Sequence, residues 1–329
     1  MAKIGFTTTI PVEVIYAAGK IPIDLNNIFI GHSQPQGMLE RAERRGFPRN
    51  CCAWIKGIYS SLIEQQDIEC IIGVVEGDCS NTRALLEVLE VEGIRYIPFS
   101  YPVSRDIKRI KTEIDRLIHL FGQDTGSVNR MKDRLDRIRE KVGYLDRLTY
   151  IDNRITGFEN HLWQVSCSDF EGDYTAFEKK LDGFIRTAEA REQMPQQVRL
   201  GYIGVPPIFP ALYSFVEDCG ARVVYNEVQR QFTMVPALGR DIYETYRQFT
   251  YPYSLETRLE DIQEAIKERR LDGILHYTQA FCFRGIEDIV IKERLGVPVL
   301  MVEGDRPGEL DARTKLRAEA FIEMLKDRK

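Results

Sequence analysis

Short apolar runs alternate with helical patterns over the first hundred residues. The apolar runs, which are typical of buried strands, cover residues 3–8, 21–25, 68–75 and 96–99. Helical spacing of the apolar residues falls between them, at residues 12–18, 51–66 and 82–92. Such alternation favours a parallel sheet with helices on both faces. We predict an N-terminal α/β domain over residues 1–105, with ligands at the carboxyl ends of its strands.

The pattern around Cys79 recurs around Cys282. Each cysteine follows a strand-like run and precedes a helical pattern. A glycine comes 14 residues later in both places, as Gly93 and as Gly296, and each glycine opens a second strand-like run. Similarity at a fixed separation predicts a diverged internal repeat, with one α/β unit in each half of the chain.

The correspondence extends upstream to Cys52. Cys52 precedes Ile71 by 19 residues, and Leu255 precedes Ile274 by the same number. Because the segment from Leu255 has helical spacing, Cys52 is expected at the start of a helix.

Helical periodicity dominates the middle of the chain. Apolar residues recur at three- and four-residue steps over 107–121, and further helical runs cover 128–148 and 174–187. Residues 157–173 have no such period and are expected to be irregular. We predict a helical insert over residues 106–195 that bridges the two halves.

The remaining residues, 196–329, are predicted to form a C-terminal α/β domain. Its first strand is expected at 198–203, within a segment, 200–207, that is similar to residues 4–11. A final helix is expected over residues 312–329. One arrangement that we consider is that this helix returns to pack on the first half of the chain.

Composition and charge restrict the class of protein. The 329 residues are 43% hydrophobic and 29% charged, which is ordinary for a globular protein. A net charge of −5 argues against a protein that binds nucleic acid through its phosphates. No apolar run is long enough for a membrane span, and the first residues lack a signal-peptide pattern, so the cytoplasm is the expected location.

Seven cysteines, an odd number, fit metal or redox use better than a disulfide framework. Cys52, Cys79 and Cys282 are expected where helices begin and strands end. Iron-sulfur clusters require thiolates, and the positive end of a helix lowers thiol pKa values and stabilises an anionic cluster. Taken singly, each of the three is more typical of a small buried hydrophobe. The matched positions of Cys79 and Cys282 favour a function.

The sequence resembles the 2-hydroxyacyl-CoA dehydratase and benzoyl-CoA reductase family, in particular a D-component-like subunit. The resemblance runs in order along nearly the whole chain. It rests on Ile10-Pro-Val-Glu-Val-Ile-Tyr-Ala-Ala-Gly-Lys-Ile-Pro-Ile-Asp-Leu25, Cys52-Ala-Trp-Ile-Lys56, Gly77-Asp-Cys-Ser80, Ile155-Thr-Gly-Phe-Glu159, Phe281-Cys-Phe-Arg284, Gly296-Val-Pro-Val-Leu-Met-Val-Glu-Gly-Asp305 and Arg317-Ala-Glu-Ala-Phe-Ile-Glu-Met-Leu325.

This resemblance implies two flavodoxin-like α/β domains joined by helices, with a 4Fe-4S cluster held by Cys52, Cys79 and Cys282. With three protein thiolates, one iron would keep an exchangeable position for a substrate. The family implies an ATP-dependent activator iron-sulfur protein as electron donor, an acyl-CoA substrate, and a dimer with a second copy or a related subunit. A related branch of the family carries a double-cubane cluster, which needs more cysteines.

The neighbouring Cys51 leaves the ligand set open. Adjacent thiols at a helix start point in different directions, so one of Cys51 and Cys52 is a ligand and the other a bystander or an extra ligand. We favour Cys52. Cys70, Cys167 and Cys219 are interpreted as structural, because they lie in an apolar strand, in the helical insert and beside a helix-ending glycine.

Four other side chains are weaker candidates. Glu13, at the start of the first helix, is either a cap or a proton carrier, and we favour the cap. His32 and Ser33 lie in the loop 31–37 and either reach a ligand or form a plain turn. His276 lies in an apolar strand, where an interior hydrogen-bonded histidine is the simpler interpretation, but its closeness to Cys282 allows a supporting role there.

The residue patterns and the resemblance leave three functions open. The first, which the resemblance implies, is an oxygen-sensitive iron-sulfur reductase or dehydratase-like lyase, with a double-cubane cluster reductase of small molecules as its variant. The second is a non-catalytic electron relay or cluster-carrying subunit. The third is an α/β binding module without metal.

Overall fold

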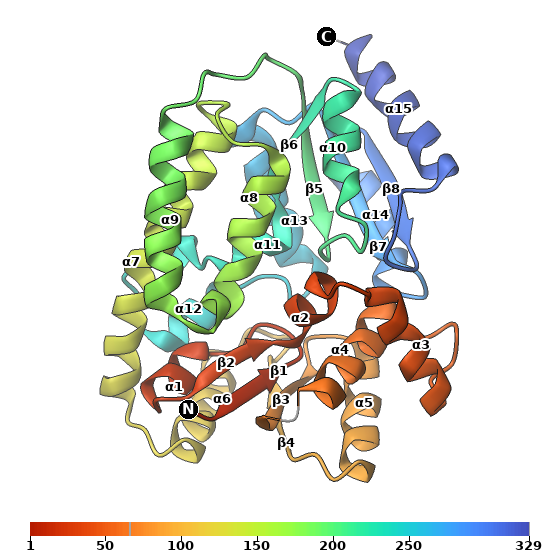
Figure 1. The fold of residues 1–329 in the computed structure, drawn as a ribbon. Coiled ribbons are helices and arrows are strands. Elements are labelled where there is room, and N and C mark those ends of the chain that lie inside the picture. Colours follow the sequence, from red (N-terminus) through yellow and green to blue (C-terminus); the bar gives the residue numbers. More distant parts are fainter. Residues whose placement is uncertain (66, 329) are drawn as a thin grey trace. The chain divides into compact units, whose positions relative to one another are not determined.

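The computed structural model describes residues 1–65 and 67–328 (Figure 1). The expected last residues of two helices, Gln66 and Lys329, lie outside the described residues. The chain divides into two compact units. Unit 1 comprises residues 1–140, 166–179 and 232–254, and unit 2 comprises residues 141–165, 180–231 and 255–329. Residues 106–195, which we expected to form a helical insert, are divided between the two units. The bounds of the three predicted domains stay a prediction.

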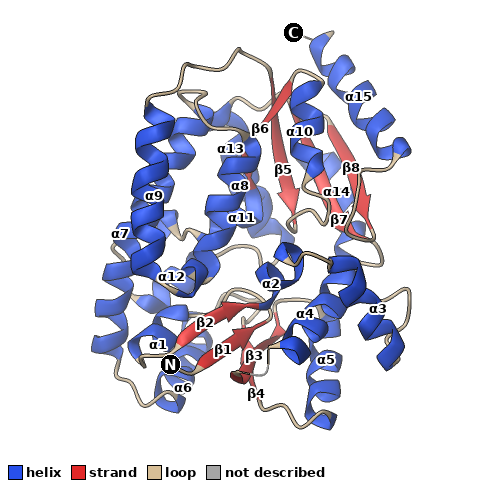
Figure 2. Ribbon diagram, in the orientation of Figure 1, coloured by secondary structure: helices blue, strands red, loops and turns tan. Residues whose placement is uncertain are grey.

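Unit 1 is built on a parallel sheet of four strands in the order β2-β1-β3-β4 (Figure 2). This is the order of the first four strands of a flavodoxin-like sheet, in which the chain reverses its direction of winding between β1 and β3. The strands are β1 (Lys3–Phe6), β2 (Ile21–Asp24), β3 (Ile68–Glu76) and β4 (Tyr96–Ser100).

Unit 1 has more helices around this sheet than the sequence analysis predicted. The helices α2 and α3 were missed, although α3 has clear signals: Pro35 at its start, and Gly46, with φ of +120°, at its end. The helices are α1 (Val12–Ala17), α2 (Leu25–Gly31), α3 (Pro35–Arg45), α4 (Ala53–Glu64), α5 (Ser80–Val91), α6 (Ile107–Leu120) and α12 (Ile242–Gln248).

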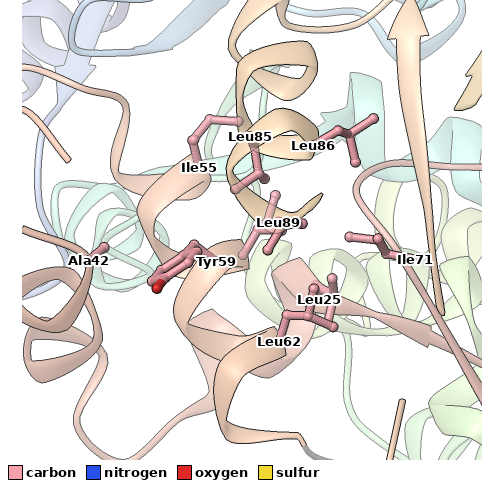
Figure 3. Close-up of a cluster of buried hydrophobic side chains, with 10 residues drawn as sticks. Leu25, Ala42, Ile55, Tyr59, Leu62, Ile71, Leu85, Leu86 and Leu89 are labelled. Atoms are coloured by element: carbon pink, nitrogen blue, oxygen red, sulfur yellow. The ribbon is translucent and has the colours of Figure 1, made fainter. Parts of the chain in front are cut away.

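One face of β3 carries an apolar core (Figure 3). Leu85 and Leu89 of α5 and Ile55 of α4 pack against Ile71 of the strand. The helix α5 lies so close to the sheet that a Cβ on Gly73 would be 2.6 Å from the Leu86 methyl groups. Burial of these side chains, at about 2 kcal/mol each, holds the helix layer on the sheet.

Unit 2 repeats this architecture. Its parallel sheet has the order β6-β5-β7-β8, which is the order of unit 1. The register repeats as well: Ile71 pairs with Tyr96 in unit 1, and their partners 203 positions later, Ile274 and Val299, pair in unit 2. The predicted internal repeat is confirmed. The strands are β5 (Val198–Gly204), β6 (Ala221–Asn226), β7 (Gly273–Gln279) and β8 (Val299–Gly304).

The helices of unit 2 cover both faces of its sheet. Leu259 of α13 and Ile291 of α14 belong to the apolar cluster that contains Ile274. On the other face, a Cβ on Gly273 would lie 2.7 Å from a methyl group of Leu325, so α15 packs on this sheet. The expectation that the last helix returns to the first half is therefore wrong. The helices are α8 (Gly157–Val165), α10 (Ala211–Asp218), α13 (Leu255–Arg269), α14 (Glu287–Arg294) and α15 (Ala312–Lys326).

The expectation that residues 157–173 are irregular is wrong for α8. Thr156 and Glu159 form a reciprocal capping box: Thr156 N donates to Glu159 Oε2 at 3.0 Å, and Glu159 N donates to Thr156 Oγ1 at 3.2 Å. This pair starts a helix in spite of the weak apolar period of the segment.

Three helices contain a boundary between the units. They are α7 (Thr125–Tyr150), α9 (Tyr174–Glu189) and α11 (Glu227–Phe232). Among the helices of the described residues, none has both the length and the apolar character required to cross a membrane.

Candidate functional site

The three cysteines predicted as ligands all occupy the capping position before a helix. Cys52 precedes α4, Cys79 precedes α5, and Cys282 precedes a 3-10 helix, Phe283–Ile286, that leads into α14. All three have ψ close to 130°, as expected of a residue that enters a helix from an extended segment. The prediction that Cys52 starts a helix is confirmed. Because helices between parallel strands begin at the carboxyl ends of those strands, each cysteine stands at the carboxyl edge of its own sheet.

A glycine shapes the turn that carries Cys79. Gly77 has φ of +91°, and a Cβ there would lie 2.8 Å from both the Pro252 carbonyl oxygen and the Tyr101 Cβ. A larger residue would therefore have to displace a neighbouring backbone segment. The sequence Gly77-Asp78-Cys79 thus fixes where the chain leaves β3 and where the thiol stands.

Backbone hydrogen bonds hold the turn that carries Cys282. Cys282 N donates to the Gln279 carbonyl oxygen, and Gly285 N donates to the Cys282 carbonyl oxygen, both at 3.0 Å. The preceding residue, Phe281, has φ of +64°, a left-handed conformation that costs about 1 kcal/mol for a non-glycine residue. Strain of this kind is concentrated at functional sites.

Cys51 is half-buried and packs, with Cys52, against the apolar cluster beneath α4. Burial raises the pKa of the Cys51 thiol, and the charge of Lys56 opposes this only in part. A raised pKa disfavours the thiolate that a metal requires. The capping position belongs to Cys52, and the choice between the two stays a prediction.

The three cysteines interpreted as structural are poor thiolates. Burial raises the pKa of Cys70 in β3 and of Cys219 at the end of α10, and it raises the pKa of Cys167 to about 12. None of the seven cysteines forms a disulfide in the part of the chain that the structure describes.

Within residues 1–65 and 67–328, no group of three or more His, Cys, Asp or Glu side chains is gathered closely enough to hold a metal ion. Cys52 and Cys79 belong to unit 1 and Cys282 belongs to unit 2. The combination of the three as one ligand set stays a prediction.

Glu13 is fully buried in an ion pair. Its Oε1 lies 2.7 Å from Arg139 Nη2, and its Oε2 accepts a hydrogen bond from the Tyr246 hydroxyl at 2.8 Å. Arg139 also donates to Asp136 at 3.0 Å. The structure thus places the carboxylate against a buried arginine and a tyrosine, and the choice between a cap and a proton carrier stays a prediction.

His32 and Ser33 form the turn between α2 and α3. His32 Nδ1 accepts a hydrogen bond from Gln34 N at 3.0 Å, and His32 Nε2 lies 3.5 Å from a Glu64 carboxylate oxygen. Ser33 is exposed. The structure thus gives His32 one partner within this turn and one at the end of α4.

His276 is buried in β7, and its Nδ1 lies 2.9 Å from Asp288 Oδ1 of α14. The other carboxylate oxygen of Asp288 lies 2.5 Å from Lys292 Nζ. Burial alone would raise the pKa of Asp288, but hydrogen bonds from His276 and Lys292 outweigh burial and hold it below its usual value. Sequence analysis missed Asp288, the partner of His276, and Lys292, the second partner of Asp288. The repeat would have flagged them, because the residues 203 positions earlier are Leu85 and Leu89.

A buried ion network at the carboxyl edge of the unit 2 sheet also escaped sequence analysis. Glu227 Oε2 accepts a hydrogen bond from Gly204 N at 2.8 Å, and its Oε1 accepts one from Arg258 Nε at 2.7 Å. Arg258 also pairs with Glu287, which accepts a further hydrogen bond from Arg284 at 3.1 Å. No helical period or motif predicts this network. Its sequence signal is a charged residue, Arg258, on the inward face of α13.

Comparison with known families supports the resemblance seen in the sequence. The family model of the 2-hydroxyglutaryl-CoA dehydratase D-component matches residues 7–325, which include all seven cysteines. A comparison with the curated proteins gave no match.

Proposed function

The chain belongs to the family of the 2-hydroxyglutaryl-CoA dehydratase D-component, and from this premise we propose that it binds a 4Fe-4S cluster through Cys52, Cys79 and Cys282. It would act as a subunit of a low-potential 2-hydroxyacyl-CoA dehydratase or reductase. The observation that carries the proposal is the placement of all three thiols at helix starts on the carboxyl edges of two repeated sheets.

The residues present fit an iron-sulfur cluster. A cluster needs thiolates, which cysteines at helix starts supply more readily because the helix dipole stabilises negative charge there. The three thiols are half-buried, so solvent reaches them only in part, and this protects a cluster from exchange. When bound, the cluster would supply low-potential electrons. Because the protein would provide three thiolates instead of the usual four, one iron would stay open to a ligand.

The chain's own residues then have defined tasks. Gly77 and the strained Phe281 fix the turns that present Cys79 and Cys282. Unit 2 supplies buried polar groups as well: His276 lies in β7, the strand that leads to Cys282, and Arg258 lies in α13. D-components work with an activator, so we propose an ATP-dependent iron-sulfur protein as the electron donor, and an acyl-CoA thioester and a second subunit as the other partners.

Anaerobic iron and sulfide analysis with Mössbauer spectroscopy tests the ligand set. We expect Cys52→Ser, Cys79→Ser and Cys282→Ser to lose most of the iron, whereas Cys70→Ser and Cys219→Ser keep it. Full iron in Cys52→Ser together with loss in Cys51→Ser would move the first ligand to Cys51. Wild-type protein without iron would leave an α/β binding module and end the proposal.

The same samples separate the related alternatives. An iron content of about four per chain indicates one cubane, and about twice that value indicates a double-cubane cluster. An enzyme's open iron changes its spectrum when acyl-CoA is added. A non-catalytic electron relay gives a spectrum that acyl-CoA leaves unchanged.

A further inference from the structure

Three side chains in unit 2 form a chain from solvent to the interior. Lys292 is 48% exposed, Asp288 is 9% exposed and His276 is 1% exposed. Asp288 joins the other two through its two carboxylate oxygens. Because an ionised carboxylate only accepts hydrogen bonds, the ring proton of a neutral His276 must lie on Nδ1, and Nε2 is left with a lone pair.

That lone pair is buried without a partner. Among the described residues, neither His276 Nε2 nor Thr278 Oγ1 has a hydrogen-bond partner. The two residues are two positions apart in β7, so their side chains lie on the same face of the sheet. A Cβ on Gly285 would lie 4.0 Å from Thr278 Oγ1, which places the Cys282 turn over this face. A buried polar atom of this kind calls for an explanation, and a catalytic role is one.

The repeat shows that the fold does not require these polar groups. The positions equivalent to His276, Asp288 and Lys292 in unit 1, 203 residues earlier, are Gly73, Leu85 and Leu89. Unit 1 forms the same strand order and register with these apolar residues. A structural role is therefore met more simply by the unit 1 residues.

We propose that His276 is a buried proton carrier for the reaction at the Cys282 turn, with Asp288 and Lys292 holding the Nδ1 side of its ring. Nε2 of the neutral ring takes one proton from a reacting group, and the imidazolium that forms is balanced by the Asp288 carboxylate. Nε2 then gives that proton back to a reacting group, which restores the neutral ring, and no electron moves. Dehydration and reduction both include proton transfers of the kind that a positioned imidazole performs. The proposal rests on the proposed function.

The other buried charged groups that the structure describes in this helix layer are paired. Arg258 of α13 pairs with Glu227 and Glu287, and Arg284 of the 3-10 helix pairs with Glu287. The strands beside His276 contribute Ile203 and Met301, which carry no charge. Asp288 is thus the group that responds to a charge on His276.

Nitrogen-15 NMR of the imidazole rings tests the proton position in the full-length protein. The chain has four histidines, so single His→Gln substitutions assign every ring. We expect His276 to carry its proton on Nδ1 when neutral, and to add one on Nε2 as the pH falls while the protein stays folded. Asp288→Asn should move the proton to Nε2, because an amide can donate to Nδ1. A wild-type His276 protonated on Nε2, or one that never gains a second proton in the folded protein, overturns the proposal.

A kinetic measurement separates a proton carrier from a structural residue. We expect chemical reduction of the iron centre to depend on pH in wild type, and to become pH-independent and about tenfold slower in His276→Gln at equal iron content. His119→Gln, at an exposed position of α6, should behave as wild type. An unchanged pH profile in His276→Gln contradicts the proposal. If the purified protein contains no iron, the proposed function is wrong. The NMR experiment then tests the position of the proton on His276 by itself.

Discussion

The helix layer over β3 in unit 1 and the helix layer over β7 in unit 2 use opposite kinds of side chain at matching positions. Figure 3 shows the unit 1 layer, which is apolar. Ile55, Leu85 and Leu89 correspond, 203 positions later, to Arg258, Asp288 and Lys292. Buried ion pairs seldom stabilise a fold more than apolar residues of similar volume. The comparison teaches that this fold forms with apolar residues at these positions, so the paired charges of unit 2 are not required by the fold.

The exchange also changes how the second helix lies on the sheet. Leu86 is 2% exposed, whereas its counterpart Ile289 is 64% exposed. Gly73 allows α5 to approach β3 closely, and the imidazole of His276 stands in its place on β7. The helix α14 therefore makes fewer apolar contacts with its strand than α5 makes.

The largest expected effect comes from placing the unit 2 residue in unit 1. Leu85→Asp removes a buried leucine and puts a carboxylate where neither histidine nor lysine can pair with it. We expect the free energy of unfolding to fall by about 5 kcal/mol, measured by urea denaturation of the cluster-free protein.

The reverse change is the matched control. Asp288→Leu removes a partner from His276 and Lys292 but adds apolar contact, so we expect a loss of about 1–2 kcal/mol. Equal losses for the two substitutions would contradict the view that the two layers differ in kind.

The second prediction concerns Arg258, which is fully buried between Glu227 and Glu287. Arg258→Ile, which installs the unit 1 residue, leaves the buried Glu227 carboxylate without its cation and leaves Glu287 with Arg284 alone. We expect a loss of about 3–4 kcal/mol by urea denaturation. The triple variant with Glu227→Gln and Glu287→Gln should recover most of this loss, and failure to recover would mean that packing, not charge, sets the effect.

Sequence alone predicted the repeat, and the structure shows why. The separation of 203 residues is the same for the cysteines, for the following glycines and for the paired strands, because no insertion interrupts β3, α5 and β4 relative to β7, α14 and β8. If a strand lost one residue, the side chains beyond that point would move from the buried face of the sheet to the opposite face. The two parallel α/β units and the helix starts at Cys52 and Cys79 could therefore be predicted.

Partners distant in the chain could not be predicted from periodicity. Glu13 pairs with Arg139, which is 126 positions away and belongs to a helix whose pattern shows only an amphipathic face. When a charged residue stands at a position where the helical pattern predicts an apolar one, the sequence does not show which residue of opposite charge pairs with it. Only comparison of the two halves marks such positions in unit 2, where Arg258 stands in place of Ile55.

The third prediction concerns the approach of α5 to its strand. Gly73→Ala would bring a Cβ to 2.6 Å from the Leu86 methyl groups, so we expect a loss of about 2 kcal/mol from overpacking. Gly31→Ala is the control, because a Cβ on Gly31 would have no neighbouring atom within 4 Å. Thermal denaturation should show a lower midpoint for the first variant alone, and an unchanged midpoint would show that α5 can move away freely.

The ends of β2 and β6 offer a second difference between the units. Asp24 and Asn226 occupy matching positions in the two sheets. Asp24 of β2 pairs in register with Phe6 of β1, and Asn226 of β6 pairs in register with Tyr202 of β5. In unit 2, Asn226 donates to the Asn160 amide oxygen at 2.9 Å. In unit 1, the buried Asp24 meets Asp169, whose Oδ2 accepts a hydrogen bond from Asp24 N at 2.8 Å. A neutral amide pair thus corresponds to two buried carboxyl groups.

This difference predicts a small pH effect. Burial first, and the charge of Asp24 second, raise the pKa of Asp169 to about 7. The folded state therefore holds a proton that the unfolded state releases near pH 4, so this contribution to stability is present below pH 4 and is lost as the pH rises to about 7. Asp24→Asn, which copies Asn226 and keeps the helix cap, removes only the smaller cause. We expect it to raise stability at pH 8 by about 1 kcal/mol and to leave stability at pH 4 nearly unchanged. Urea denaturation at the two pH values measures this, and an equal gain at both would show that charge is not the cause.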